Sequence, residues 1–268
     1  MLFCFTNHST QHLTGIDFGM NNVINKTALI TGAAKRIGAA IAEHLHQNGM
    51  NIIIHYNTSE EEALQLADKL NENRAASAIA IKAKLEDKDS YSALINSSLE
   101  FKGNIDALIN NASVFYPTPV DNLNDEQWNE MININLKAPL FLSQIAAASL
   151  HKNNGCIINI ADIHASRPLK DHSIYSVSKA GLTMLTQSLA KELAPTIRVN
   201  AISPGAITWP DEMADETKQS ILAHTAMKRT GSMEDISKAV LFFIRDADYI
   251  TGQVLNIDGG RTLYTQDT

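Results

Sequence analysis

The strongest constraint on the fold is a regular alternation between short apolar runs and longer amphipathic stretches. From Lys26 onward the apolar runs are continuous rather than alternating in polarity, which is typical of strands covered on both faces. The expected strands are 27–31, 51–56, 78–82, 105–109, 156–160, 197–203 and 253–257, and the expected helices are 36–48, 59–73, 87–101, 124–150, 173–193 and 233–245. This order predicts an α/β fold, a doubly wound parallel sheet with helices on both faces and ligands at the carboxyl ends of the strands.

The chain is expected to form one domain. Its 268 residues contain no linker rich in Pro, Gly or Ser, so we predict a single domain over 25–268. Residues 1–24 show neither periodicity nor the features of a targeting signal, and we predict a flexible N-terminal extension. The formal net charge of -7 and the absence of a basic run argue against nucleic acid as a ligand. No apolar stretch reaches the roughly 20 residues that cross a bilayer, and the two cysteines suit a reducing cytoplasm.

A glycine-containing turn follows the first expected strand directly. The segment Thr31-Gly-Ala-Ala-Lys-Arg-Ile-Gly38 connects this strand to the first expected helix. Strand, glycine turn and helix is the arrangement in which a dinucleotide pyrophosphate meets a helix N-terminus. The motif is not G-x-G-x-x-G but the looser form Thr-Gly-x-x-x-Gly-x-Gly, with Arg36 in place of its middle glycine. It predicts a Rossmann-like nucleotide site that contains Gly32, Lys35, Arg36, Ile37 and Gly38.

The end of the second expected strand indicates which dinucleotide binds. A fold that selects NAD usually places an acidic residue there to bind the ribose hydroxyls. This chain has no carboxylate in that region before Glu60. Hydroxyl and amide groups, with Lys35 and Arg36 nearby, tolerate a 2′-phosphate, so we predict NADPH (NADP) as the cofactor. The residues assigned to this region are His55, Tyr56, Asn57, Thr58 and Ser59.

Three residues predict the chemistry. Tyr175 and Lys179 are four apart in an expected helix, so both should project from one face, with the ammonium lowering the pKa of the phenol from about 10. Tyr175 then becomes a proton donor near neutral pH. An ionised Asp162 repels the oxyanion that forms when hydride adds to a ketone, which favours a substrate with N–H groups, such as a C=N-containing heterocycle. Taken singly, Asp162 can also be a helix cap and Tyr175 a half-buried core residue.

These motifs together resemble the short-chain dehydrogenase/reductase family from Lys26 to Gly260. Asn110-Asn-Ala-Ser113 stands where the family has Asn-Asn-Ala-Gly, and Asn135 matches the asparagine that holds a water against the catalytic lysine. Ser203-Pro-Gly205 matches the loop beside the nicotinamide. The catalytic set that this resemblance implies is Asp162, Tyr175, Lys179 and Asn135, without a metal. The further cofactor contacts that it implies are Leu85, Asn111, Ala112, Ser113, Tyr175, Lys179, Pro204, Gly205 and Ile207.

Within that family the details are similar to pteridine reductases, because of Arg36, Ser113, Phe115 and the aspartate in place of the usual serine. This resemblance implies NADPH-dependent hydride transfer to a C=N bond of a dihydropterin or dihydrofolate, with Phe115 stacked on the pterin. Thr58 departs from the arginine usual in the eukaryotic-type enzymes. The implied substrate contacts are Arg36, Ser113, Phe115, Asp162, Tyr175 and Trp209, the last in a loop after Gly205 that is long enough to be a lid. His164 and His172 flank the site and are expected to be ordinary exposed histidines.

Two other functions stay open. A short-chain carbonyl reductase, such as a 3-oxoacyl-carrier-protein reductase, would need the Asp162 carboxyl to be protonated. A non-catalytic NADP(H)-binding sensor that acts through a partner protein is disfavoured by the intact Tyr175, Lys179 and Asn135. The residues do not distinguish dihydrofolate, dihydromonapterin and dihydrobiopterin. The family resemblance also implies a homotetramer built through helices 124–150 and 173–193.

Overall fold

A single parallel sheet forms the centre of the protein. The computed structural model describes residues 22–209 and 213–264. The strands are β1 (Thr27–Ile30), β2 (Asn51–Tyr56), β3 (Ala78–Lys82), β4 (Ala107–Asn110), β5 (Cys156–Ile160), β6 (Arg198–Pro204) and β7 (Val254–Ile257). They are ordered β3-β2-β1-β4-β5-β6-β7, and every neighbouring pair is parallel. The predicted doubly wound sheet is therefore confirmed.

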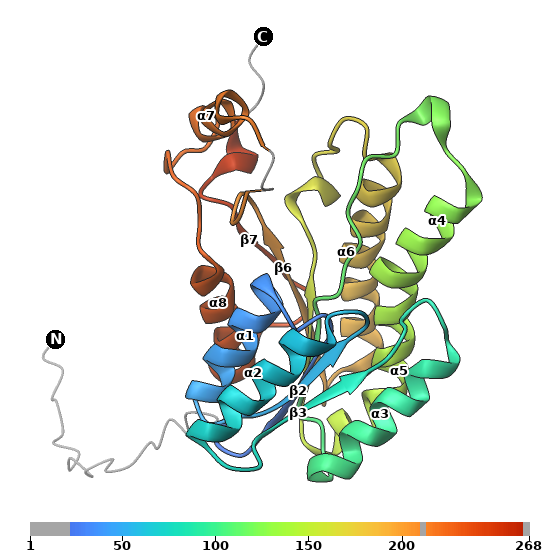
Figure 1. Cartoon of the computed structure of the whole chain (residues 1–268), viewed down its shortest axis with the longest axis vertical. Helices are drawn as coiled ribbons and strands as arrows, with labels where there is room; N and C mark the ends of the chain where they lie inside the picture. The colour runs from blue at the N-terminus through green and yellow to red at the C-terminus, as the bar shows by residue number, and fades with distance from the viewer. Residues whose placement is uncertain (1–21, 210–212, 265–268) are drawn as a thin grey trace, which may run out of the picture.

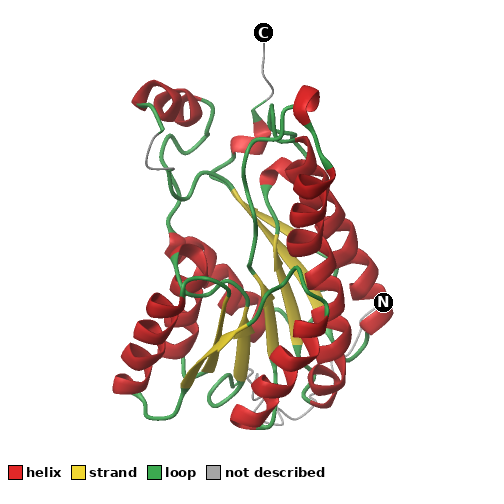
Figure 2. Ribbon diagram, turned by 45° about the vertical axis from the view of Figure 1, so that its right-hand side comes forward, coloured by secondary structure: helices red, strands yellow, loops and turns green. Residues whose placement is uncertain are grey.

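Helices cover both faces of this sheet (Figures 1 and 2). They are α1 (Arg36–Gln47), α2 (Glu60–Asn73), α3 (Asp89–Lys102), α4 (Asp125–Ile132), α5 (Ala138–Lys152), α6 (Ser173–Leu193), α7 (Asp215–Ala223) and α8 (Met233–Arg245). Short helical turns are η1 (Val120–Asn122), η2 (Asn133–Lys137), η3 (Ile163–Ala165) and η4 (Arg261–Leu263). Helices α1, α2 and α8 pack on one face, and α3, α5 and α6 on the other.

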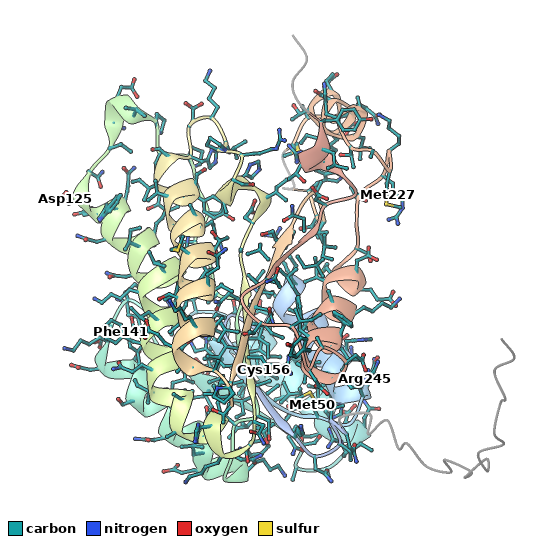
Figure 3. All side chains as sticks on the ribbon, turned by 180° about the vertical axis from the view of Figure 1, so that it is seen from behind. Met50, Asp125, Phe141, Cys156, Met227 and Arg245 are labelled. Atoms are coloured by element: carbon teal, nitrogen blue, oxygen red, sulfur yellow. The ribbon has the colours of Figure 1, made fainter. Side chains whose placement is uncertain are left out.

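Strand side chains are buried on both faces, as the continuous apolar runs predict. Successive side chains of a strand point to opposite faces. In β2, Ile52 and Ile54 belong to the core cluster beneath α1 and α8, whereas Ile53 belongs to the cluster beneath α3 and α5. Cys156, in β5, is buried in the interior (Figure 3).

The expected helix 124–150 is divided in the structure. Helix α4 starts at a capping box in which Asn124 and Gln127 exchange hydrogen bonds, and it ends at Ile132. A π-helical turn, η2, then precedes α5. Such turns are frequent at functional sites, and this one contains Asn135.

The ends of the predicted domain differ slightly from expectation. Most of the predicted extension 1–24 lies outside the described residues, but Val23 is already buried in the core, so the domain includes it. The loop expected after Gly205 is followed by helix α7, which lies beyond the carboxyl end of β6 (Figure 1). The strand order reverses between β1 and β4, and ligands of such sheets bind at the carboxyl ends beside this point.

Candidate active site

The glycine turn after β1 is packed too tightly for side chains. Gly32 has a φ of +61°, and a Cβ there would lie 2.9 Å from the Ala112 Cα. A Cβ on Gly38 would lie 2.3 Å from the Gly32 carbonyl oxygen and 2.6 Å from the Asn111 Nδ2. The Asn111 amide donates to the carbonyls of Thr31 and Gly32 at 2.9 Å each. The turn and the segment after β4 therefore form one rigid cradle at the sheet's switch point.

The His55 side chain holds this cradle in place through hydrogen bonds. Its Nδ1 accepts the Gly32 N–H at 3.0 Å, so Nε2 carries the proton and donates to the Ala83 carbonyl at 3.1 Å. Burial lowers the pKa of the His55 imidazole to about 4, so the ring is neutral. The sequence assigns His55 to cofactor contacts, but both ring nitrogens are occupied by backbone groups. We correct this assignment: the His55 side chain holds the turn in place.

The other residues at the end of β2 differ in accessibility. Tyr56 is buried, Asn57 and Thr58 are exposed, and Ser59 is half-buried. Lys35, expected near a 2′-phosphate, forms an exposed ion pair with Glu62 at 2.5 Å. Glu62 of α2 thus neutralises Lys35, whereas the exposed Asn57 and Thr58 are accessible to a ligand.

Arg36 connects the glycine turn with the loop after β6. Its backbone has a φ of +53°, in the left-handed region that favours the glycine found at this position in the family motif. The guanidinium donates to the Thr208 Oγ1 at 2.8 Å. Pro204 and Ile207 are buried beside this contact, Gly205 packs on Asp258, and Trp209 is half-buried. The predicted lid therefore begins next to the nucleotide turn, although residues 210–212 lie outside the described part.

Asp162 and Tyr175 meet at the carboxyl end of β5. The Tyr175 hydroxyl donates to the Asp162 Oδ2 at 2.8 Å. The Asp162 Oδ1 accepts the His164 N–H at 2.8 Å and so caps η3. Both sequence interpretations of Asp162, as a cap and as a partner of the phenol, are thus correct together. The Ser113 hydroxyl also acts on the phenol, in the direction that lowers its pKa.

The pKa of Tyr175 is shifted in the direction opposite to the prediction. Burial, followed by the charge and hydrogen bond of Asp162, raises the pKa of the phenol far above its ordinary value. Lys179 lies 5.7 Å from the phenol ring centroid and donates its Nζ proton to the Ile160 carbonyl at 2.9 Å. The spacing argument correctly placed Lys179 beside Tyr175, but the expectation that its charge lowers the phenol's pKa is wrong. Burial also lowers the pKa of Lys179 itself to about 8, against the attraction of Asp162.

Asn135 connects η2 to the segment after β4. Its Oδ1 accepts the Val114 N–H at 2.8 Å, and its amide donates to the Val114 carbonyl at 3.0 Å and to the Ser178 hydroxyl at 3.1 Å. These bonds fix the backbone between Ser113 and Phe115 against α6. Asn135 therefore positions the substrate side of the site, in addition to any role toward Lys179.

The Phe115 ring, expected to stack on the substrate, lies beside Tyr175. Its centroid is 4.7 Å from that of Tyr175 in an edge-on arrangement and 4.7 Å from that of His172 in a stacked one. Half of the Phe115 surface remains exposed. Leu85, expected at the adenine, is 4% exposed and packs in the core with α3.

One charged residue near the site escaped the sequence interpretation. Arg261, in η4 after β7, is half-buried, and the charges of Asp162 and Asp258 both act on its guanidinium. This guanidinium makes no hydrogen bond within the described residues. The Asp258 carboxylate fixes η4 by accepting the N–H groups of Gly260 and Thr262 at 2.9 and 2.8 Å. No motif marked Arg261 in the sequence, because its position near Asp162 depends on the adjacency of β5, β6 and β7 in the sheet.

Two classes of site are absent from the described residues. Within 22–209 and 213–264, no three His, Cys, Asp or Glu side chains are grouped so that they could hold a metal ion. In the same residues, no helix is long and apolar enough to cross a membrane.

The cradle at the switch point and the adjacent tyrosine, lysine and asparagine define a nucleotide-dependent oxidoreductase. A family model described as enoyl-(acyl carrier protein) reductase matches residues 32–262. The chain belongs to the short-chain dehydrogenase/reductase family.

Relatives with different substrates resemble the chain about equally. A 3-oxoacyl-[acyl-carrier-protein] reductase of Staphylococcus aureus is 33% identical over 88% of this chain and 98% of its own length. Pteridine reductase 1 of Leishmania tarentolae is 34% identical over 88% of this chain and 96% of its own. The crystal structure of a blue fluorescent protein from a metagenomic library in complex with NADPH has a TM-score of 0.85 and 31% identity, covering 90% and 99% of the two chains.

Proposed function

We propose that the protein is an NADPH-dependent pteridine reductase that reduces a C=N bond of a dihydropterin or dihydrofolate to the tetrahydro form. The observation that carries this proposal is the 2.8 Å hydrogen bond from the Tyr175 hydroxyl to the Asp162 carboxylate. A carboxylate at that distance from the proton donor attracts N–H groups and repels a developing alkoxide. The similarity to a pteridine reductase agrees with this chemistry.

NADPH suits the residues of the nucleotide site. The cradle of Gly32 and Gly38 leaves no room for a Cβ, which allows the backbone to approach a pyrophosphate closely. Asn57 and Thr58 present exposed polar groups at the end of β2, where an NAD-selective fold would have a carboxylate. The similar structure of the blue fluorescent protein holds NADPH. When bound, the cofactor supplies the hydride for the ring carbon of the C=N bond.

The protein's own groups supply the proton and the orientation. Tyr175 donates its hydroxyl proton to the ring nitrogen next to the carbon that receives hydride, so that C=N becomes CH–NH. Asp162 accepts an N–H of the pterin and aligns the ring with the phenol, and it relays the proton that restores Tyr175. Phe115 covers one face of the flat ring. Lys179, on α6, is buried, and its ammonium donates to the Ile160 carbonyl at the end of β5, next to Tyr175.

A panel of substrates tests the proposal. NADPH oxidation is followed with dihydropterins, dihydrofolate and an acetoacetyl thioester, using wild-type protein and the Tyr175→Phe variant. We expect turnover of at least one dihydro compound and its loss, by a factor of roughly 10² or more, in Tyr175→Phe. Turnover of the thioester alone would favour a carbonyl reductase, a function that fits the similarity to the acyl-carrier-protein reductase. Tight NADPH binding without any turnover would favour a sensor.

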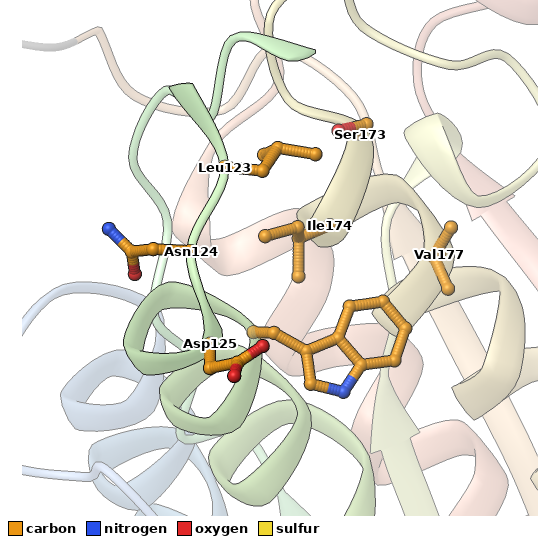
Figure 4. Close-up of a pocket in the computed structure, with 7 residues that line it drawn as sticks. Leu123, Asn124, Asp125, Ser173, Ile174 and Val177 are labelled. Carbon is orange, nitrogen blue, oxygen red and sulfur yellow. The ribbon is translucent and has the colours of Figure 1, made fainter. Parts of the chain in front are cut away.

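We also propose a homotetramer that works in the cytoplasm. The outer faces of α4, α5 and α6 expose large apolar side chains: Trp128, Leu140, Val177 and Met184 are 46%, 38%, 51% and 64% exposed. Two apolar grooves lie there, one lined by Leu123, Trp128, Ile174 and Val177 (Figure 4) and the other by Leu136, Leu140 and Met184. Such a face is typical of an interface between subunits. The size of the assembly is measured by light scattering coupled to gel filtration.

A further inference from the structure

Phe115 is held between two other rings although half of its surface is exposed. The His172 imidazole stacks on it with a centroid distance of 4.7 Å and an interplanar angle of 17°. The Tyr175 ring meets it at the same centroid distance but at 78°. The stacked His172 ring covers one face of Phe115. The exposed half of the Phe115 surface is what remains for a flat ligand.

His172 is itself fixed by several contacts. Its Nδ1 donates to the Lys170 carbonyl at 2.8 Å, and its backbone N–H donates to the Leu169 carbonyl at 3.2 Å. The neighbouring backbone is tied to the segment that carries Phe115, because the Thr118 N–H donates to the Asp171 carbonyl at 2.5 Å. His172 precedes α6 but its side chain does not cap the helix. Its imidazole therefore contributes the ring stack rather than helix stability.

We propose that His172 is a positioning residue that sets the plane of Phe115 and thereby selects flat heterocyclic substrates. This inference rests on the proposed reduction of a pterin, whose ring would stack on the free face of Phe115. A planar ring gains contact only if Phe115 keeps one orientation, because a tilted ring loses most of the shared surface. A flexible acyl chain makes no comparable demand on the ring plane.

The kinetic experiment compares two substitutions of the same residue. His172→Ala removes the stack, and His172→Phe keeps an aromatic ring there without the imidazole nitrogens. With a dihydropterin as substrate, we expect KM to rise roughly three- to tenfold in His172→Ala, with kcat within about twofold, and His172→Phe to restore KM. The dissociation constant for NADPH should be the same in all three proteins.

His164 provides a matched control. Its Nδ1 also donates to a backbone carbonyl, that of Arg167 at 2.9 Å, but its ring stacks on no aromatic side chain in the described residues. His164→Ala should therefore leave KM within about twofold. An equal rise of KM in His172→Phe and His172→Ala would overturn the proposal, as would a loss of kcat or of NADPH affinity in His172→Ala, which indicates a general structural role.

A second measurement needs no substrate and separates this inference from the proposed function. Urea unfolding is measured for wild type, His172→Ala, Phe115→Leu and the double variant. If the two rings stabilise each other, the two single changes are non-additive. Non-additivity without pterin turnover would support the stacking of His172 on Phe115 and reject a pterin as the substrate. Additivity would reject a stabilising contact between the two rings, whatever the substrate.

Discussion

Replacing Asp162 by serine should turn the site toward ketones. The variant exchanges the carboxylate that accepts the Tyr175 hydroxyl proton for the hydroxyl that the family usually has at this position. Serine also accepts hydrogen bonds as a helix cap, so the bond from the His164 N–H can be retained and the fold should lose little stability. The change therefore tests the charge at position 162 rather than the local structure.

The size of the effect follows from the distances. The Asp162 Oδ2 lies 2.8 Å from the Tyr175 Oη, so a substrate oxygen bound to the same hydroxyl would lie about 4 Å from the carboxylate. Two negative charges about 4 Å apart repel by about 4 kcal/mol at an effective dielectric constant of about 20. This energy corresponds to roughly a thousandfold in rate. It is the gain with a ketone that follows from removing the repulsion alone.

The assay measures kcat/KM for an acetoacetyl thioester and for a dihydropterin with the same NADPH concentration. We expect Asp162→Ser to raise the first value, by about a thousandfold where the full repulsion is removed, and to lower the second by at least about tenfold. The NADPH dissociation constant and the unfolding midpoint show whether the variant is intact. An intact variant whose preference between the two substrates is unchanged would refute the electrostatic argument.

Three further predictions concern the cradle and the assembly. The pKa of His55 is lowered to about 4 in the folded protein, so as the pH falls the unfolded state takes up a proton at this residue first. The free energy of unfolding should therefore fall by roughly 3 kcal/mol between pH 6.5 and pH 4. Urea unfolding at a series of pH values should show a smaller fall for His55→Gln. Gly38→Ala places a Cβ 2.3 Å from the Gly32 carbonyl and should weaken NADPH binding at least roughly tenfold by fluorescence titration, whereas Gly103→Ala, with no atom within 4 Å of the new Cβ, should leave affinity unchanged. Met184→Glu should reduce the mass seen by light scattering if the face of α6 is an interface, and an unchanged mass would remove that face from the proposed tetramer.

The sheet could be predicted because its strands are buried on both faces. Seven continuous apolar runs leave few alternatives, and the observed strands begin and end within two residues of the expected ones. The π-helical turn between α4 and α5 was not predicted, because Pro139, at the start of α5, disfavours an uninterrupted helix but does not indicate the kind of turn that precedes it. The π-helical turn places the Asn135 amide against Val114 and Ser178, which come from other parts of the chain. Contacts of that kind leave no mark in the local periodicity.

The site was predictable where one element or one motif determines it. Tyr175 and Lys179 share a helix face, and the glycine turn follows its strand directly. The supporting contacts were not predictable, because each joins distant segments: His55 reaches the Gly32 N–H, and Arg261 approaches Asp162 from the other end of the chain. From its residue type alone, His55 cannot be distinguished from any other polar residue at the end of a strand.

The raised pKa of Tyr175 bears on which bond the site can reduce. The prediction took the sign of the shift from Lys179 alone, whereas burial and Asp162 determine it in the structure. A phenol that holds its proton so firmly is a weak acid, and it transfers the proton readily only to a strong base. Hydride addition to C=N develops charge on nitrogen, which is a stronger base than the alkoxide formed from a ketone and therefore takes the proton from Tyr175 before a full anion forms beside Asp162. The same carboxylate that disfavours an alkoxide therefore adjusts the donor to a nitrogen acceptor, and these two effects of Asp162 both favour the C=N substrate.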